Sequence, residues 1–143
     1  MTAGGNLASG GVTIVGVGQT LNFTQYLNSA VVAADVGKPV KFSANNTVNL
    51  AGDGDAIHGV LKSYEDRLAE DVKTGTVGIN GGYRFTYKTG DAVAVGDSVV
   101  GAGSGEVKKA TLRQGNIVVN KDTTNQTVDV LFGYHALDTD TDT

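Results

Sequence analysis

Apolar and polar residues alternate along much of this chain, and the alternation is clearest in the segment GYRFTYKT, residues 82–89. One side of an extended chain here carries Tyr83, Phe85 and Tyr87. The residues between these aromatic residues are polar. A period of two is typical of a strand that buries one face. We therefore predict a strand in which the three aromatic side chains are buried.

The same pattern predicts further short strands. In residues 40–44 the core-facing side chains are expected to be Val40, Phe42 and Ala44, with Pro39 at the start of the strand, where its missing N–H does least harm. Residues 21–34 show no clean period, so the pattern assigns neither helix nor strand to this mixed segment. Residues 64–79 favour strand over helix, since Thr74, Gly75 and Thr76 suit extended chain. The other predicted strands are 12–17, 47–51, 56–64, 92–95, 98–100, 107–112 (with Val107, Ala110 and Leu112), 116–120 and 127–136.

Glycine and aspartate separate these strands. The segments GDGD at residues 52–55, Gly96-Asp97 and GAGSG at residues 101–105 are predicted turns, because glycine adopts positive φ without steric cost. Roughly eight to eleven short strands with regular turn signals predict an all-β fold, a compact small β-barrel or sandwich. We expect an extended N-terminal arm with a first strand in residues 1–34, packed on a neighbour, the barrel or sandwich in residues 35–136, and an acidic flexible tail in residues 137–143.

Composition narrows the functional classes. The chain has 143 residues, of which 21 are glycine and none is cysteine, and its net charge is −4. The lysines and arginines are scattered, so we expect no nucleic acid partner, which would need a concentrated basic patch. No apolar run reaches the ~20 residues of a membrane helix, and the N-terminus has no signal-peptide pattern, so we expect no membrane association.

Candidate chemistry is sparse. The glycine spacing of residues 11–16 is similar to that of a phosphate loop, but Val17 stands where the lysine should be, so no nucleotide cofactor is expected. Asp53, Asp55 and His58 are suitable metal ligands in kind, yet a tight turn explains them as well. A cluster of carboxylates lies in a polar run and consists of Glu65, Asp66, Glu70 and Asp71. We interpret it as a solvated face. We predict no catalytic residues, no cofactor and no metal.

Residues 35–110, about half the chain, resemble the capsid cement (head decoration) proteins of tailed bacteriophages. The similar features are the G-x-P-V strand at residues 37–40, an A-x-x-G-V strand at residues 56–60, and the hairpin G-D-x-V-x-x-G-D-x-V at residues 90–99 with its glycine-rich turn. The resemblance implies a small, mostly β, non-enzymatic protein, usually a homotrimer. It also implies a place on the outer surface of the virion, where the protein would bind neighbouring major capsid proteins and stabilise the capsid.

Two other functional classes stay open. A β-sandwich module that binds carbohydrate or a receptor would present exposed aromatic residues, whereas the Phe and Tyr residues here mostly fall on predicted core faces. A small hydrolase would use the carboxylates of residues 65–71 or the Asp53/Asp55/His58 group. For the leading interpretation, the apolar residues of the glycine-rich leader are the expected capsid or neighbour contacts, namely Leu7, Val12 and Ile14.

Overall fold

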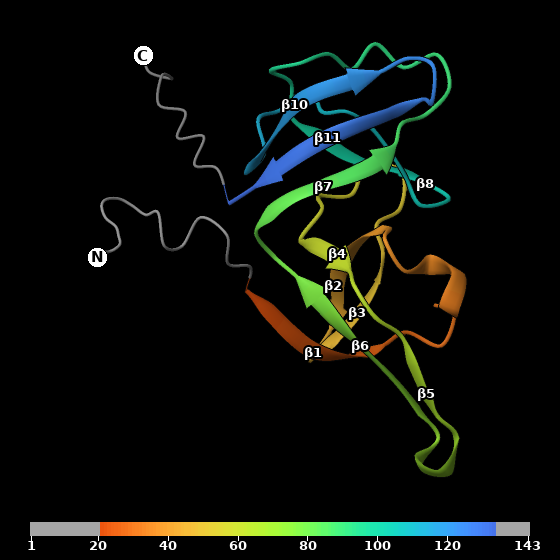
Figure 1. The fold of residues 1–143 in the computed structure, drawn as a ribbon. Helices are drawn as coiled ribbons and strands as arrows, with labels where there is room; N and C mark the ends of the chain where they lie inside the picture. The colour runs from red at the N-terminus through yellow and green to blue at the C-terminus, as the bar shows by residue number, and fades with distance from the viewer. Residues whose placement is uncertain (1–20, 134–143) are drawn as a thin grey trace, which may run out of the picture.

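The computed structural model describes residues 21–133; residues 1–20 and 134–143 lie outside this range. The described chain is 51% strand and 5% helix, so the predicted all-β class is confirmed. Residues 1–20 of the predicted arm, with the strand predicted at 12–17, and the predicted tail at 137–143 fall outside the described residues. The strands form two modules, one above the other in Figure 1.

The first module is a small closed barrel. Its strands follow the order β1-β3-β2-β4-β6, and pairing of β1 with β6 closes the ring. β1 runs parallel to β3 and the other pairs are antiparallel. A short strand, β5, pairs with the first part of β6 and extends away from the ring. The strands are β1 (Asn22–Leu27), β2 (Pro39–Ala44), β3 (Thr47–Leu50), β4 (Gly59–Leu61), β5 (Glu65–Arg67) and β6 (Val72–Gly78).

Aliphatic side chains fill the barrel. The core consists of Leu27, Val31, Val40, Val48, Leu61 and Val77. Space inside is tight at Gly75, where an added Cβ would overlap the carbonyl oxygen of Ser63 and lie 2.9 Å from Cδ1 of Leu61. A glycine is therefore required there by the close approach of the backbone.

The second module is a three-stranded sheet, β10-β11-β7, packed with the hairpin β8–β9. The strands are β7 (Gly81–Thr86), β8 (Val99–Gly103), β9 (Glu106–Lys109), β10 (Asn116–Asp122) and β11 (Thr127–Phe132). Edge-to-face contacts link Phe132 to Tyr83 and Phe85 in its core. The buried residues of this core are Phe85, Tyr87, Val93, Val99, Val107, Val118, Val128, Val130 and Phe132.

The two modules share one strand. On β4, Leu61 packs in the barrel core while the preceding residue, Val60, packs in the core of the second module. Because successive side chains of a strand point to opposite faces, β4 forms a wall common to both cores. Ala51 and Ile57, from the segments flanking the 52–55 turn, also pack in the second core. The modules thus share the wall at β4, with a separate apolar core on each side of it.

Several predictions of local structure are confirmed. On β7, Phe85 is buried, as is Tyr87 just after the strand, and Arg84 and Thr86 on the opposite face are exposed. Tyr83, which was also expected to be buried, is only partly buried against the same core. Residues 64–79 form the hairpin β5–β6 rather than an α-helix, with the short 3-10 turn η2 (Leu68–Glu70) at its end. Ser104 and Gly105 both adopt positive φ in the turn between β8 and β9, the combination that a tight hairpin turn requires.

Three predictions are wrong. Phe42 is 43% exposed and stacks on His58 instead of packing in the barrel core, and Ala44, which follows an irregularity in the β2–β3 pairing, is exposed too. Residues 92–95 are not a strand, since the N–H groups of Val93 and Ala94 bond to aspartate side chains instead of a neighbouring strand. Leu112 is 75% exposed because β9 ends at Lys109.

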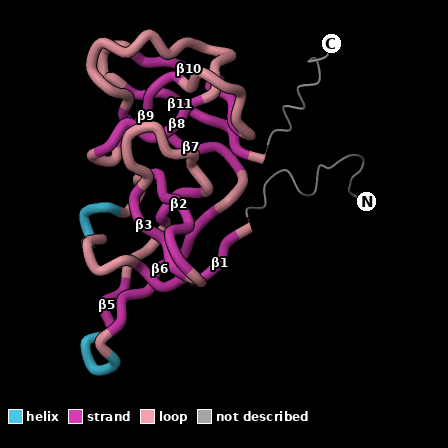
Figure 2. Tube along the Cα trace, turned by 180° about the vertical axis from the view of Figure 1, so that it is seen from behind, coloured by secondary structure: helices cyan, strands magenta, loops and turns pink. Residues whose placement is uncertain are grey.

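The mixed segment at residues 21–34 contains β1 and the start of a second 3-10 turn, η1 (Ala33–Asp35). The sequence grouped this segment with the N-terminal arm, but β1 closes the barrel and Val31 packs in the barrel core. Asp35 is buried and holds the turn together. Its carboxylate accepts the N–H of Val32 at 2.9 Å and binds Nζ of Lys38 at 2.8 Å. Figure 2 shows both short helical turns, in cyan.

Candidate binding surfaces

The residues predicted as capsid or neighbour contacts, Leu7, Val12 and Ile14, lie outside the described residues. The structure therefore directs attention to the surfaces of residues 21–133. Three of these surfaces combine exposed apolar side chains with a depression. We refer to them as the hairpin groove, the sheet face and the junction cavity.

The Asp53, Asp55 and His58 side chains do not converge. Asp53 pairs with Nζ of Lys108 at 2.8 Å, and this bond lowers the pKa of the aspartate. Asp55 pairs with Nζ of Lys41 at 2.6 Å, which lowers its pKa as well. Nδ1 of His58 accepts the backbone N–H of Phe42 at 3.0 Å. Within residues 21–133, no three His, Cys, Asp or Glu side chains are arranged to hold a metal ion.

The carboxylate cluster lies on the hairpin β5–β6, which projects from the barrel (Figures 1 and 2). Glu65, Asp66, Glu70 and Asp71 are all exposed. Glu70 forms a two-point ion pair with Arg67, from Nε at 2.5 Å and Nη2 at 3.2 Å, and this hydrogen bonding lowers the pKa of Glu70. A glycosidase acid needs the opposite shift, so this glutamate is unsuited to that role.

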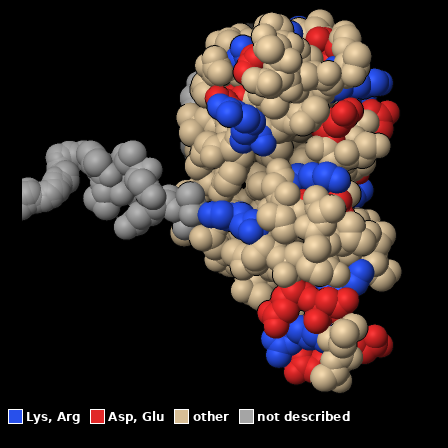
Figure 3. All heavy atoms as spheres, turned by 45° about the vertical axis from the view of Figure 1, so that its right-hand side comes forward, with Lys and Arg blue, Asp and Glu red and all other residues tan. Residues whose placement is uncertain are grey.

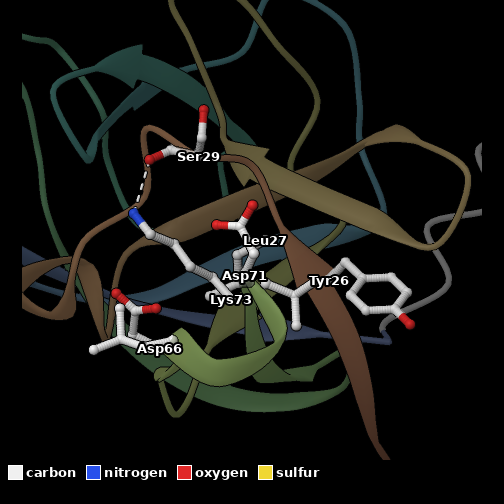
Figure 4. Close-up of a pocket in the computed structure, with 8 residues that line it drawn as sticks. Tyr26, Leu27, Ser29, Asp66, Asp71 and Lys73 are labelled. Carbon is white, nitrogen blue, oxygen red and sulfur yellow. Dashed lines mark hydrogen bonds between the residues drawn. The ribbon is translucent and has the colours of Figure 1, made fainter.

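The hairpin groove lies where the hairpin meets the barrel. It has a volume of about 340 Å³ and is lined by Tyr26, Leu27, Ser29, Asp66, Leu68, Asp71, Val72 and Lys73. Tyr26 is 52% exposed and Leu68, at the end of the hairpin, is 81% exposed. Aromatic and aliphatic side chains on β1 and on the hairpin thus face solvent next to the same depression (Figure 4).

Lys73 fixes the hairpin to the barrel. Its Nζ donates to the carbonyl oxygen of Ser29 at 2.8 Å, drawn as a dashed line in Figure 4, and to that of Val31 at 2.9 Å. The same ammonium group lies 5.9 Å from the centre of the Tyr64 ring. Asp66 is opposite Lys73 in the strand register, yet the two form no ion pair. The lysine therefore holds the segment between β1 and η1, and its charge offsets only part of the negative charge of the groove.

The edge of the groove is acidic. Residues 65–73 carry four carboxylates against two cations, Arg67 and Lys73, a net charge of −2. Since Arg67 binds Glu70 and Lys73 binds backbone carbonyls, no described cation pairs with Asp66 or Asp71. Figure 3 shows acidic side chains gathered at this end of the molecule.

The sheet face is the outer side of β7, β11 and β10. Val119 and Leu131 are exposed there, beside Gly82, where an added Cβ would meet only open space. These residues border a depression of about 450 Å³. Arg84 pairs across the strands with Asp129, with Nε at 2.7 Å and Nη2 at 3.2 Å from the carboxylate, and this lowers the pKa of Asp129. The surface is thus an apolar patch with a satisfied ion pair at its border.

The junction cavity lies between the two modules and also measures about 450 Å³. Phe42 and His58 stack at its side with ring centres 5.8 Å apart. Ile57, Ile79 and Phe132 complete its apolar lining.

Sequence reasoning missed the hairpin groove, because Tyr26 and Leu68 lie on segments far apart in the chain. One signal was present, namely a lone leucine at position 68 inside an acidic run. The expectation that most aromatic residues are buried also needs correction. Among the described aromatic residues, Phe23, Tyr26 and Phe42 are exposed.

Comparison of the sequence with models of known protein families and with curated proteins found no match. The part of the chain that the structure describes contains no helix long and apolar enough to cross a membrane.

Proposed function

We propose that this protein is a structural virion protein, a capsid cement protein of a tailed bacteriophage. It binds the outer surface of the head and stabilises the capsid by bridging neighbouring major capsid proteins. The chain is made in the host cytoplasm and carries no enzymatic activity in this role. The resemblance of residues 35–110 to that family is the sequence support for the proposal.

The observation that carries the proposal is the distribution of exposed apolar side chains over both modules. Tyr26 and Leu68 lie on the barrel side, and Val119 and Leu131 lie on the second module. A protein that bridges two neighbours needs more than one contact surface on a rigid body. The shared wall at β4, with an apolar core packed on each of its faces, supplies the rigid connection between those surfaces.

In this proposal the protein acts as a homotrimer. Each contact with the capsid is then made three times, so that modest individual interfaces combine through effective concentration. The N-terminal segment adds a further contact, and Leu7, Val12 and Ile14 are its proposed contact residues. An extended arm binds by adding main-chain hydrogen bonds to an exposed sheet edge, with apolar side chains entering pockets.

The experiment has two parts. The mass of the purified chain in solution is measured by sedimentation equilibrium, and its binding to phage heads assembled without it is measured by co-sedimentation. A trimer that binds heads saturably supports the proposal. A strict monomer that does not bind heads overturns it. The variant Leu7→Ser/Val12→Ser/Ile14→Ser tests the arm separately, since unchanged head binding would remove these residues from the contact.

A second candidate is a module that binds carbohydrate or a receptor on a fibre or a cell surface. The exposure of Phe23, Tyr26 and Phe42 favours it, because sugar rings stack on exposed aromatic side chains. A glycan array with reproducible hits, lost in the Tyr26→Ala or Phe42→Ala variant, would favour this candidate over the capsid role.

A further inference from the structure

We infer that the hairpin groove is a docking site for a basic, partly apolar extended segment of a partner protein. The segment places an aliphatic side chain against Leu68 and Tyr26 and sets lysine or arginine side chains beside Asp66 and Asp71. This inference goes beyond the proposed function, because it concerns what the groove binds and does not depend on whether the partner is a capsid protein.

The apolar part of the argument rests on Leu68. This side chain is exposed at the end of a projecting hairpin, and the groove beside it is lined by Tyr26, Leu27 and Val72. Burying a leucine side chain is favourable, so the groove gains most from a ligand that covers Leu68 with apolar atoms. A sugar, whose hydroxyl groups need polar partners, gains little from an aliphatic side chain.

The electrostatic part rests on charges that the protein leaves uncompensated. Asp66 and Asp71 line the groove, and neither forms an ion pair with a described residue. On the same hairpin Arg67 pairs with Glu70, and Lys73 donates to the carbonyl groups of Ser29 and Val31, so that its single positive charge leaves the lining with a net negative charge from Asp66 and Asp71. A partner that supplies one or two cations complements this net negative border, and like-charged partners are repelled.

The geometry of the groove suits an extended chain. One side is formed by Tyr26 and Leu27 on β1, and the other by the hairpin. The two hydrogen bonds that Lys73 donates to the segment after β1 hold these two sides together. The depression therefore exists before any ligand binds. A preformed groove spares the ligand the cost of ordering its site.

The test uses three synthetic peptides with the full-length protein: acetyl-KLKLK-amide, acetyl-KSKSK-amide and acetyl-ELELE-amide. Binding is followed by changes in the backbone amide NMR signals of the protein. We expect saturable shifts at residues 26–29 and 66–73 with the first peptide, weaker shifts with the second and none with the third. Raising the salt from about 0.05 M to about 0.5 M should weaken the binding of KLKLK, since surface charges are screened.

Variants locate the site. Leu68→Ser should weaken KLKLK binding by about tenfold. Asp66→Asn/Asp71→Asn should weaken it too and should remove its salt dependence, and asparagine keeps the left-handed backbone at position 71 accessible. Leu112→Ser is the matched apolar control, because Leu112 is also highly exposed, and Glu106→Gln is the matched charge control.

Four outcomes would overturn the inference. The peptides could fail to give saturable shifts at the groove, or the groove variants could bind KLKLK as well as the two control variants do. The groove signals could instead change with the concentration of the protein alone and stop doing so in Leu68→Ser, in which case a second copy of this chain is the occupant. A glycan that shifts the same signals more strongly than KLKLK would make the groove a sugar site. None of these measurements requires a phage head, so they stand or fall separately from the capsid proposal.

Discussion

The phenolic oxygen of Tyr83 lies against Gly78, so closely that a Cβ atom at position 78 would overlap it. Gly78 ends β6 of the barrel, and Tyr83 belongs to β7 and packs on the core of the second module. The hydroxyl group is buried, has no hydrogen-bond partner among the described residues, and has its pKa raised by burial. This contact therefore joins the modules by close packing without a polar bond.

Gly78→Ala should destabilise the protein. The added Cβ would overlap the Tyr83 oxygen and lie 2.8 Å from Cδ of Lys62, and overpacking of this kind costs about 1–3 kcal/mol. Tyr83→Phe removes the unpaired oxygen and should be neutral or stabilising. Urea unfolding of both single variants and the double variant measures the coupling. The double variant should be more stable than the sum of the two effects implies, and simple additivity would contradict the contact.

Asp35 should make the protein sensitive to acid. Burial disfavours its charged form, but the hydrogen bond from Lys38, that from the Val32 N–H and the charge of Lys38 outweigh it, so the pKa lies below 3.8. A lowered pKa in the folded state contributes stability above pH 3.8, and that stability is lost as the pH falls through the folded value. Asp35→Asn should cost about 1–3 kcal/mol at neutral pH.

The measurement for Asp35 is urea unfolding at neutral pH and again at about pH 3. The stability gap between wild type and Asp35→Asn should narrow in acid. A gap that is the same at both pH values would show that the charge on Asp35 contributes nothing.

Lys73→Met should loosen the segment between β1 and η1. Methionine keeps most of the apolar stem but leaves the carbonyl groups of Ser29 and Val31 without their donor, at a cost of about 1–2 kcal/mol. Amide hydrogen exchange should speed up at residues 28–32. Lys88→Met, at an exposed lysine in the second module, is the control, and equal effects of the two variants would contradict the role assigned to Lys73.

Asn116 should be the most sensitive polar position of the second module. It is 2% exposed, and its side chain accepts the N–H of Val99 at 2.8 Å and donates to the C=O of Val99 at 3.2 Å, so that it links β10 to β8. Asn116→Asp sets a buried carboxylate against that carbonyl and should cost about 3 kcal/mol or more. Thermal unfolding measures the loss, with Asn45→Asp, at an exposed turn, as the control.

Local alternation of apolar and polar residues correctly predicted the strands that bury one face and expose the other. Phe85 and Tyr87 followed the rule because the β7–β11 pairing is regular along its length. Phe42 broke the rule although its pairing with Val48 is regular, because its ring stacks on His58 outside the barrel core, and no feature of residues 40–44 indicates that contact. Residues 92–95 alternate like a strand, but Asp91 and Asp97 supply the hydrogen bonds that a neighbouring strand would have made.

The hairpin groove was beyond the reach of sequence reasoning. Its acidic residues were visible as a cluster, and their exposure agrees with the solvated face that was predicted. The groove itself depends on β1 pairing with β6, which brings Tyr26 next to Thr74 and thus beside the base of the hairpin. Residues 21–34 have no clean period, so β1, and with it the pairing of β1 with β6, could not be assigned in advance.

The most direct measurement of the central claim is quantitative co-sedimentation of the purified chain with heads of the encoding phage that were assembled without it. The binding of an unrelated β-protein of similar size to the same heads serves as the reference. The capsid proposal predicts saturation at a fixed number of chains per major capsid protein, together with a higher temperature of head disruption. Binding no greater than that of the reference protein, or heads whose disruption temperature does not change at saturation, would contradict it.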